Sequence, residues 1–105
     1  MKWAFLILAI VFEVAGTTSM KLSDGFTNLK FSILLGIFYI LSFIFLTYTL
    51  KYFEVGLTYA IWSGVGTILI AIIGFTAFNE NITTLKIISI GFIVIGVVGL
   101  LLSEK

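Results

Sequence analysis

The chain has 105 residues, of which 61% are hydrophobic and only 10% are charged, and its formal net charge is +1. Soluble domains carry roughly 25% charged residues, so this chain has too little polar surface to cover a globule in water. The small net charge gives no basic field for nucleic acid, and the lack of cysteine and histidine excludes thiol chemistry, common zinc sites and imidazole catalysis. We therefore expect one membrane domain over residues 1–105, with no cofactor and no nucleic-acid partner.

Charged residues divide the sequence into four apolar runs, which cover about 3–20, 31–50, 55–78 and 87–103. Each run has roughly the 17–25 residues that a helix needs to cross a hydrocarbon core of ~30 Å. Lipid cannot hydrogen-bond to an unpaired backbone, and the alternating segments of a barrel are absent from the sequence. The predicted fold class is an all-α integral membrane protein with four transmembrane helices running up-down-up-down.

The connecting segments carry turn and capping signals. Residues 23–25 (Ser-Asp-Gly) and 79–81 (Asn-Glu-Asn) are typical of turns. Thr83 is a candidate N-cap for the fourth helix, with Thr84 as the competitor. A signal peptide is a weak alternative for the first run, because Glu13 would lie inside its apolar segment and no cleavage site stands out.

Lysines are balanced between the two ends of such a bundle. One end would carry Lys2, Lys51 and Lys105, and the other Lys21, Lys30 and Lys86. The positive-inside rule therefore gives no preferred orientation. A small protein with a weak topology signal would show this balance. So would a protein that inserts in both orientations and forms dimers of opposed subunits.

Glu13 is the one charged residue inside an apolar run. It lies about ten residues into the first span, which at ~1.5 Å per residue is close to the bilayer midplane. An ionised carboxylate there costs at least ~2.5 kcal/mol on insertion scales. It can take up a proton, face a wet cavity or bind a cation, and a site that alternates between proton and cation satisfies all three. The alternative is a permanently protonated glutamic acid that joins helices by hydrogen bonding.

Small and polar residues surround Glu13 on its own helix. The residues three and four positions away are Ala9, Ile10, Gly16 and Thr17. Small side chains leave room for a ligand, and Thr17 offers a hydroxyl. Close helix packing in the membrane would favour the same residue types.

The third run carries a second group of candidates. Tyr59, Trp62, Ser63 and Gly66 recur at i, i+3, i+4 and i+7, so they share one helix face. Aromatic rings attract organic cations, although aromatics near span ends also form interfacial belts. In a chain without proline, Gly64 and Gly66 are the expected source of a hinge. Tyr39 in the second run is a further aromatic candidate.

The fourth run is expected to form a dimer contact. Small residues on one face of a membrane helix favour helix–helix packing, and four helices of this length hardly enclose a pathway alone. The residues assigned to this face are Ser89, Phe92, Ile93, Gly96 and Val97.

Two segments resemble the signatures of the small multidrug resistance family. The first is residues 12–27, with the sequence FEVAGTTSMKLSDGFT, and the second is residues 56–66, with the sequence GLTYAIWSGVG. Both are long and specific, and the resemblance extends over essentially the whole chain.

This resemblance implies a proton-coupled antiporter of hydrophobic cations in the bacterial inner (cytoplasmic) membrane, working as an antiparallel, dual-topology homodimer. The family's essential glutamate corresponds to Glu13, and its aromatic site residues to Tyr39, Tyr59 and Trp62. Its supporting site residues correspond to Ala9, Ile10, Gly16, Thr17 and Ser63. Its hinge corresponds to the segment from Gly64 to Gly66, and its dimer motif begins with glycine where this chain has Ser89.

The residues after Glu13 bear on the substrate. The run from Gly16 to Lys21 resembles the branch that exports aromatic and quaternary ammonium cations rather than the branch that exports guanidinium ions. A guanidinium exporter, one half of a paired heterodimer, a channel and a non-transporting assembly subunit remain alternatives. An enzyme is not expected, because the sequence has no nucleophile–base pair, metal set or cofactor motif.

Overall fold

The computed structural model describes residues 2–103, which form four helices. Their bounds are α1 (Lys2–Leu22), α2 (Leu29–Thr49), α3 (Val55–Ala77) and α4 (Thr84–Ser103). All four are long and apolar enough to cross a membrane. This confirms the expected all-α protein with four apolar spans.

The largest difference from the expected spans is at α4, which begins at Thr84 rather than at residue 87. The side-chain oxygen of Thr83 accepts a hydrogen bond from the backbone N–H of Lys86, at 3.1 Å. Thr83 is therefore the N-cap, and residues 84–86, which precede the expected apolar run, already belong to the helix. Asn28 caps α2 in the same way, by accepting the N–H of Phe31 at 3.4 Å.

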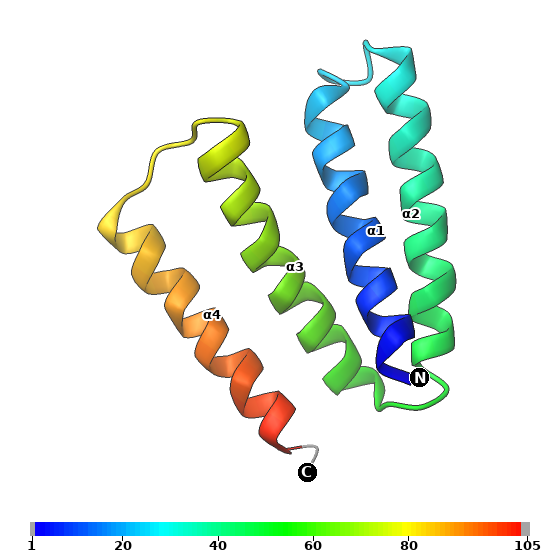
Figure 1. The fold of residues 1–105 in the computed structure, drawn as a ribbon, viewed down its shortest axis with the longest axis vertical. Helices are drawn as coiled ribbons and strands as arrows, with labels where there is room; N and C mark the ends of the chain where they lie inside the picture. The colour runs from blue at the N-terminus through cyan, green and yellow to red at the C-terminus, as the bar shows by residue number, and fades with distance from the viewer. Residues whose placement is uncertain (1, 104–105) are drawn as a thin grey trace.

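The helices alternate in direction and lie in the spatial order α2, α1, α3, α4 (Figure 1). α2 packs along the full length of α1, α3 packs against α1, and α4 packs against α3. The molecule is flat, with extents of 44 × 36 × 18 Å. The α1–α2 and α3–α4 connections lie at one end, which we call the loop end. The N-terminus, the end of α4 and the α2–α3 connection lie at the other, the terminal end (Figure 1).

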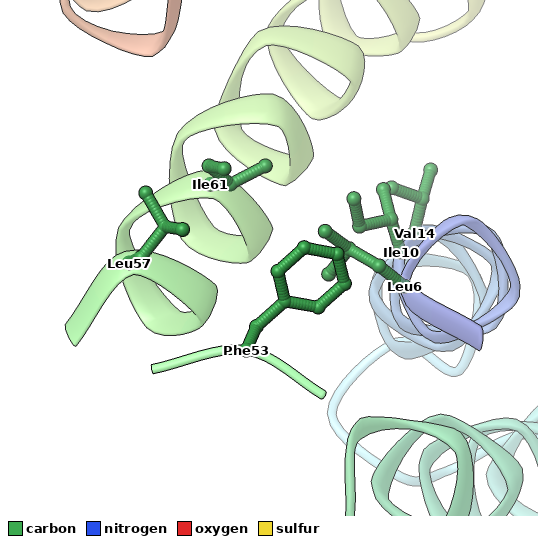
Figure 2. Close-up of a cluster of buried hydrophobic side chains, with 6 residues drawn as sticks. All are labelled: Leu6, Ile10, Val14, Phe53, Leu57 and Ile61. Carbon is green, nitrogen blue, oxygen red and sulfur yellow. The ribbon is translucent and has the colours of Figure 1, made fainter. Parts of the chain in front are cut away.

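A hydrophobic cluster joins α1 and α3 towards the terminal end. Leu6, Ile10 and Val14 recur every fourth residue on α1 and face Leu57 and Ile61 of α3, and all five are buried. The ring of Phe53, from the α2–α3 connection, lies between the two helices (Figure 2). Towards the loop end α1 and α3 diverge (Figure 1). The packed cluster thus holds α1 and α3 together towards the terminal end.

Candidate functional site

Glu13 lies in the middle of α1, one turn before Thr17, and is half-buried. Its Oε1 accepts a hydrogen bond from the Thr17 hydroxyl at 3.2 Å. Its Oε2 is buried and has no hydrogen-bond partner among the described residues. One carboxylate oxygen is therefore held in place while the other remains available to a proton or a cation.

A hydrogen-bond chain connects Glu13 to α2 through Thr17. The Thr17 hydroxyl lies 2.6 Å from the phenolic oxygen of Tyr39. Thr17 has one hydroxyl proton, so when it donates to Glu13 the Tyr39 hydroxyl must donate to Thr17. A Cβ on Gly16 would lie 3.1 Å from two Tyr39 ring atoms. The glycine therefore allows the ring to lie against α1 and to reach Thr17.

Glu13 lies in the wall of a hollow between α1 and α3, which we call the Glu13 hollow. Its volume is 250 Å³. A Cβ on Gly66 would lie 3.2 Å from Oε2 of Glu13, so the absent side chain makes room for the carboxylate. The indole Nε1 of Trp62 is also buried without a hydrogen-bond partner among the described residues. The hollow is lined by Glu13, Thr17, Trp62, Ser63, Gly66, Thr67 and Ile70.

Thr67 and Ile70 were not among the predicted site residues. Each lies four residues after a predicted member of the same α3 face, Ser63 and Gly66 respectively. Extending the i, i+3, i+4, i+7 series by one turn would have found both.

Tyr59 lies beside the hollow rather than in its wall. Its side chain is 61% exposed. Its ring meets Trp62 edge-on, with the centroids 5.4 Å apart. On the α2 side, the ring of Phe43 is 6.4 Å from Trp62 and 6.3 Å from Tyr39. The predicted aromatics Tyr39, Tyr59 and Trp62 thus form a continuous series with Phe43. No sequence pattern distinguishes Phe43 from the phenylalanines that only pack.

Ala9 and Ile10 are placed in helix contacts and do not line the Glu13 hollow. Ala9 is fully buried, and its carbonyl accepts a hydrogen bond from the Ser42 hydroxyl of α2 at 2.7 Å. Ile10 belongs to the cluster that joins α1 to α3. The structure therefore gives both residues packing contacts within one subunit.

The predicted hinge glycines face different neighbours. A Cβ on Gly64 would lie 2.7 Å from Cγ2 of Val97 in α4, whereas Gly66 faces Glu13.

The residues of the predicted dimer face of α4 differ in their exposure. Val97 is buried and Ile93 half-buried on the side towards Gly64. Ser89, Phe92 and Gly96 are exposed.

Comparisons with known proteins identify the sequence family. The family model described as Small Multidrug Resistance protein matches residues 1–102. The chain is 57% identical to the uncharacterized membrane protein YvaE of Bacillus subtilis (strain 168), covering 99% of this chain and 87% of that protein. It is 41% identical to the quaternary ammonium compound-resistance protein QacE of Escherichia coli, covering 98% and 94%. It is 42% identical to the multidrug resistance protein EbrB of Bacillus subtilis (strain 168), covering 90% and 80%.

Proposed function

Since the chain belongs to the small multidrug resistance family, we propose that it is a multidrug efflux transporter that exchanges protons for hydrophobic organic cations. The observation that carries this proposal is the Glu13 carboxylate in the wall of a hollow within the apolar span. One of its oxygens is bound by Thr17, and the other has no hydrogen-bond partner among the described residues. A buried carboxylate without a basic partner must be neutralised, and either a proton or a cation will do so.

Competition at this carboxylate is sufficient for exchange. A cation requires the ionised form of Glu13, and a proton removes that form, so the two ligands exclude each other. If the site faces the two sides of the membrane in turn, protons that enter displace cations that leave. No covalent step is required, and the side chains only have to bind, orient and release the ligands.

The active unit in this proposal is an antiparallel homodimer in the bacterial inner membrane. The Glu13 hollow, at 250 Å³, is smaller than the roughly 300–1,000 Å³ of sites for drug-sized ligands, which favours a site completed by a second copy. The three-to-three balance of lysines between the ends favours insertion in both orientations. The exposed Phe92 and Gly96 of α4 are available for the contact. Two Glu13 residues sharing one site would then titrate as a coupled pair.

Aromatic and quaternary ammonium cations are the proposed substrates. Trp62 lines the hollow, and Tyr59 and Phe43 lie beside it, so several ring faces are available to a diffuse positive charge. The Ser63 and Thr67 hydroxyls in the wall of the hollow already donate to backbone carbonyls of α3, so they place few demands on the shape of a ligand. The names of the QacE and EbrB relatives, which refer to quaternary ammonium and multidrug resistance, support the same substrates.

Uptake into proteoliposomes tests the proposal directly. We expect purified protein to accumulate tetraphenylphosphonium against its gradient when a pH gradient is imposed, and to move protons in return. Cation flux without proton movement would instead indicate a channel. Uptake of guanidinium ions but not of tetraphenylphosphonium would indicate the other substrate branch. No flux of either would favour a paired partner chain or an assembly role.

Replacing Thr17 with valine is expected to weaken cation binding about threefold to tenfold. Valine keeps the shape of the side chain but removes the hydroxyl that orients Oε1 of Glu13. The net contribution of a single hydrogen bond is roughly 0.5–1.5 kcal/mol, and 1.4 kcal/mol corresponds to about tenfold in affinity. Thr17→Ser retains the hydroxyl and serves as the control. Isothermal titration with tetraphenylphosphonium measures the effect.

Tyr39 acts on Glu13 through Thr17 in this structure. Tyr39→Phe should therefore have a smaller effect than Thr17→Val, and the double variant should bind no more weakly than Thr17→Val alone. Additive losses would show that Tyr39 contacts the cation by itself.

A further inference from the structure

A second hollow adjoins the Glu13 hollow on the side of the loop end, and we call it the outer hollow. The two hollows share Thr17 and Ile70 in their walls. The outer hollow has a volume of 180 Å³ and reaches Lys21, in the last turn of α1, and Glu80, just beyond α3. Both of these side chains are exposed. The outer hollow therefore adjoins the Glu13 hollow and lies between it and the loop end of α1 and α3.

The carboxylate of Glu80 is folded back onto the end of α3. Asn79 adopts a left-handed conformation, with φ of 53°, and turns the chain so that the backbone N–H of Glu80 donates to the carbonyl of Gly74 at 3.0 Å. A Cβ on Gly74 would collide with Oε1 and Cδ of Glu80. Glycine at position 74 thus leaves the space in which the carboxylate lies, at the wall of the outer hollow.

This position concentrates negative charge. The C-terminal end of a helix carries a partial negative charge of about one half, so α3 repels the Glu80 carboxylate instead of stabilising it. Neither Lys21 nor Lys86 forms an ion pair with Glu80 in the part of the chain that the structure describes. The Lys86 ammonium donates instead to the carbonyl of Asn81 at 2.8 Å. The carboxylate and the helix end therefore place negative charge in the wall of the outer hollow, while Lys21 lies in the same wall and Lys86 lies beside Glu80 in a neighbouring hollow.

The chemistry of the outer hollow suits an organic cation. Phe78 lies in the same wall as Glu80 and supplies an aromatic ring, and Ile73 supplies apolar surface. The hydroxyl oxygen of Thr18, another residue in the wall, is buried without a hydrogen-bond partner among the described residues. Lys21 on the α1 side repels a cation and so limits how tightly one is held.

We propose that Glu80, the end of α3 and Phe78 form an outer binding site that organic cations occupy on their way between water and Glu13. The inference rests on the proposed transport function and adds a second site to it. Because the outer site lies on the path and not at the final site, it should raise the rates of cation entry and exit together. The equilibrium affinity, which Glu13 determines, should change little.

The rate at which cations bind to the full-length protein in detergent tests this site, with stopped-flow quenching of tryptophan fluorescence as the readout. Glu80→Gln is expected to lower the association rate constant of the dication methyl viologen about threefold to tenfold. The reduction for the monocation tetraphenylphosphonium should be smaller, and the equilibrium affinity of each should stay within about twofold. Added salt should slow association to the wild type more than to Glu80→Gln, because salt screens the attraction.

Two further variants distinguish this role from damage to the fold. Lys21→Gln removes the repelling charge and should speed association. Gly74→Ala keeps every charge but displaces the Glu80 carboxylate, and it should slow association.

Glu54→Gln is the matched control. Glu54 is exposed and precedes α3 at the terminal end, so this variant removes the same charge at the opposite membrane boundary. In an antiparallel dimer, Glu80→Gln and Glu54→Gln would each remove one negative charge from each side of the membrane. The two variants therefore differ only in where the charge is lost. Glu54→Gln should bind cations at the wild-type rate.

The possible results separate this inference from the proposed function. Wild-type rates and salt dependence in Glu80→Gln, or an equal loss in Glu54→Gln, would overturn the outer site while transport through Glu13 stands. If the wild type binds neither cation, the proposed function fails and the outer site fails with it.

Discussion

Replacing Glu13 with glutamine is expected to reduce pH-driven uptake of tetraphenylphosphonium to the level of protein-free liposomes. Glutamine has nearly the same shape as protonated glutamic acid, and its amide oxygen can still accept the Thr17 hydroxyl at the position of Oε1. It cannot release a proton or carry a negative charge. The variant should therefore fold and insert normally while losing both halves of the exchange.

Binding measurements should show the same loss. We expect the affinity for tetraphenylphosphonium to fall at least about tenfold, or ~1.4 kcal/mol, and to become independent of pH. Glu13→Asp is the control, since it keeps the charge but withdraws it by one methylene from Thr17. It should retain measurable uptake at reduced affinity. Proton-coupled uptake that survives in Glu13→Gln would contradict the proposed mechanism.

The four helices could be predicted from the sequence because lipid leaves the backbone few alternatives. The same physics makes Glu13 the first candidate for the site, since a charged carboxylate inside an apolar run is costly. Both conclusions depend on the order of residues along one helix. They do not depend on how the helices are rotated against one another.

The remainder of the site depends on that rotation. Tyr39 reaches Thr17 across 22 positions of sequence, and α2 is so uniformly apolar that its periodicity does not reveal which face meets α1. The same limit applies to the residues around Glu13. At ~100° per residue, Ala9 and Gly16 fall on one flank of Glu13, and this flank meets Ser42 and Tyr39 of α2.

The other flank of Glu13 could not be resolved from the sequence either. Ile10 and Thr17 share that side of α1, yet Ile10 packs in the cluster with α3 and Thr17 lines both hollows. The difference arises because α1 and α3 converge at the terminal end and diverge at the loop end (Figure 1). No spacing along a single helix encodes that divergence.

The contact of Gly64 with α4 could not be predicted from spacing along α3 either. Replacing Gly64 with alanine gives the largest loss of stability that we expect. A Cβ there would lie 2.7 Å from Cγ2 of Val97 and 3.8 Å from Cγ2 of Ile93. The first distance is well inside van der Waals contact, so α4 must move away from α3 or Val97 must leave its favoured rotamer. Overpacking of this kind costs ~1–3 kcal/mol. We expect a lower thermal unfolding temperature in detergent and reduced uptake.

Val97→Ala in the same chain should restore most of the lost stability, because it removes the methyl group that the new Cβ meets. Gly36→Ala is the control, since a Cβ on Gly36 meets nothing within 4 Å. If Val97→Ala fails to restore stability, the close packing of Gly64 on α4 is not what the alanine disturbs.

The double variant also tests the hinge predicted at Gly64. Alanine stiffens the α3 backbone whether or not Val97 is present, so a hinge would remain impaired after the packing is repaired. Stability and uptake restored together would show that Gly64 serves only to let α4 approach α3. Stability restored without uptake would show that the same glycine must also bend, and would assign movement between the two states to the middle of α3.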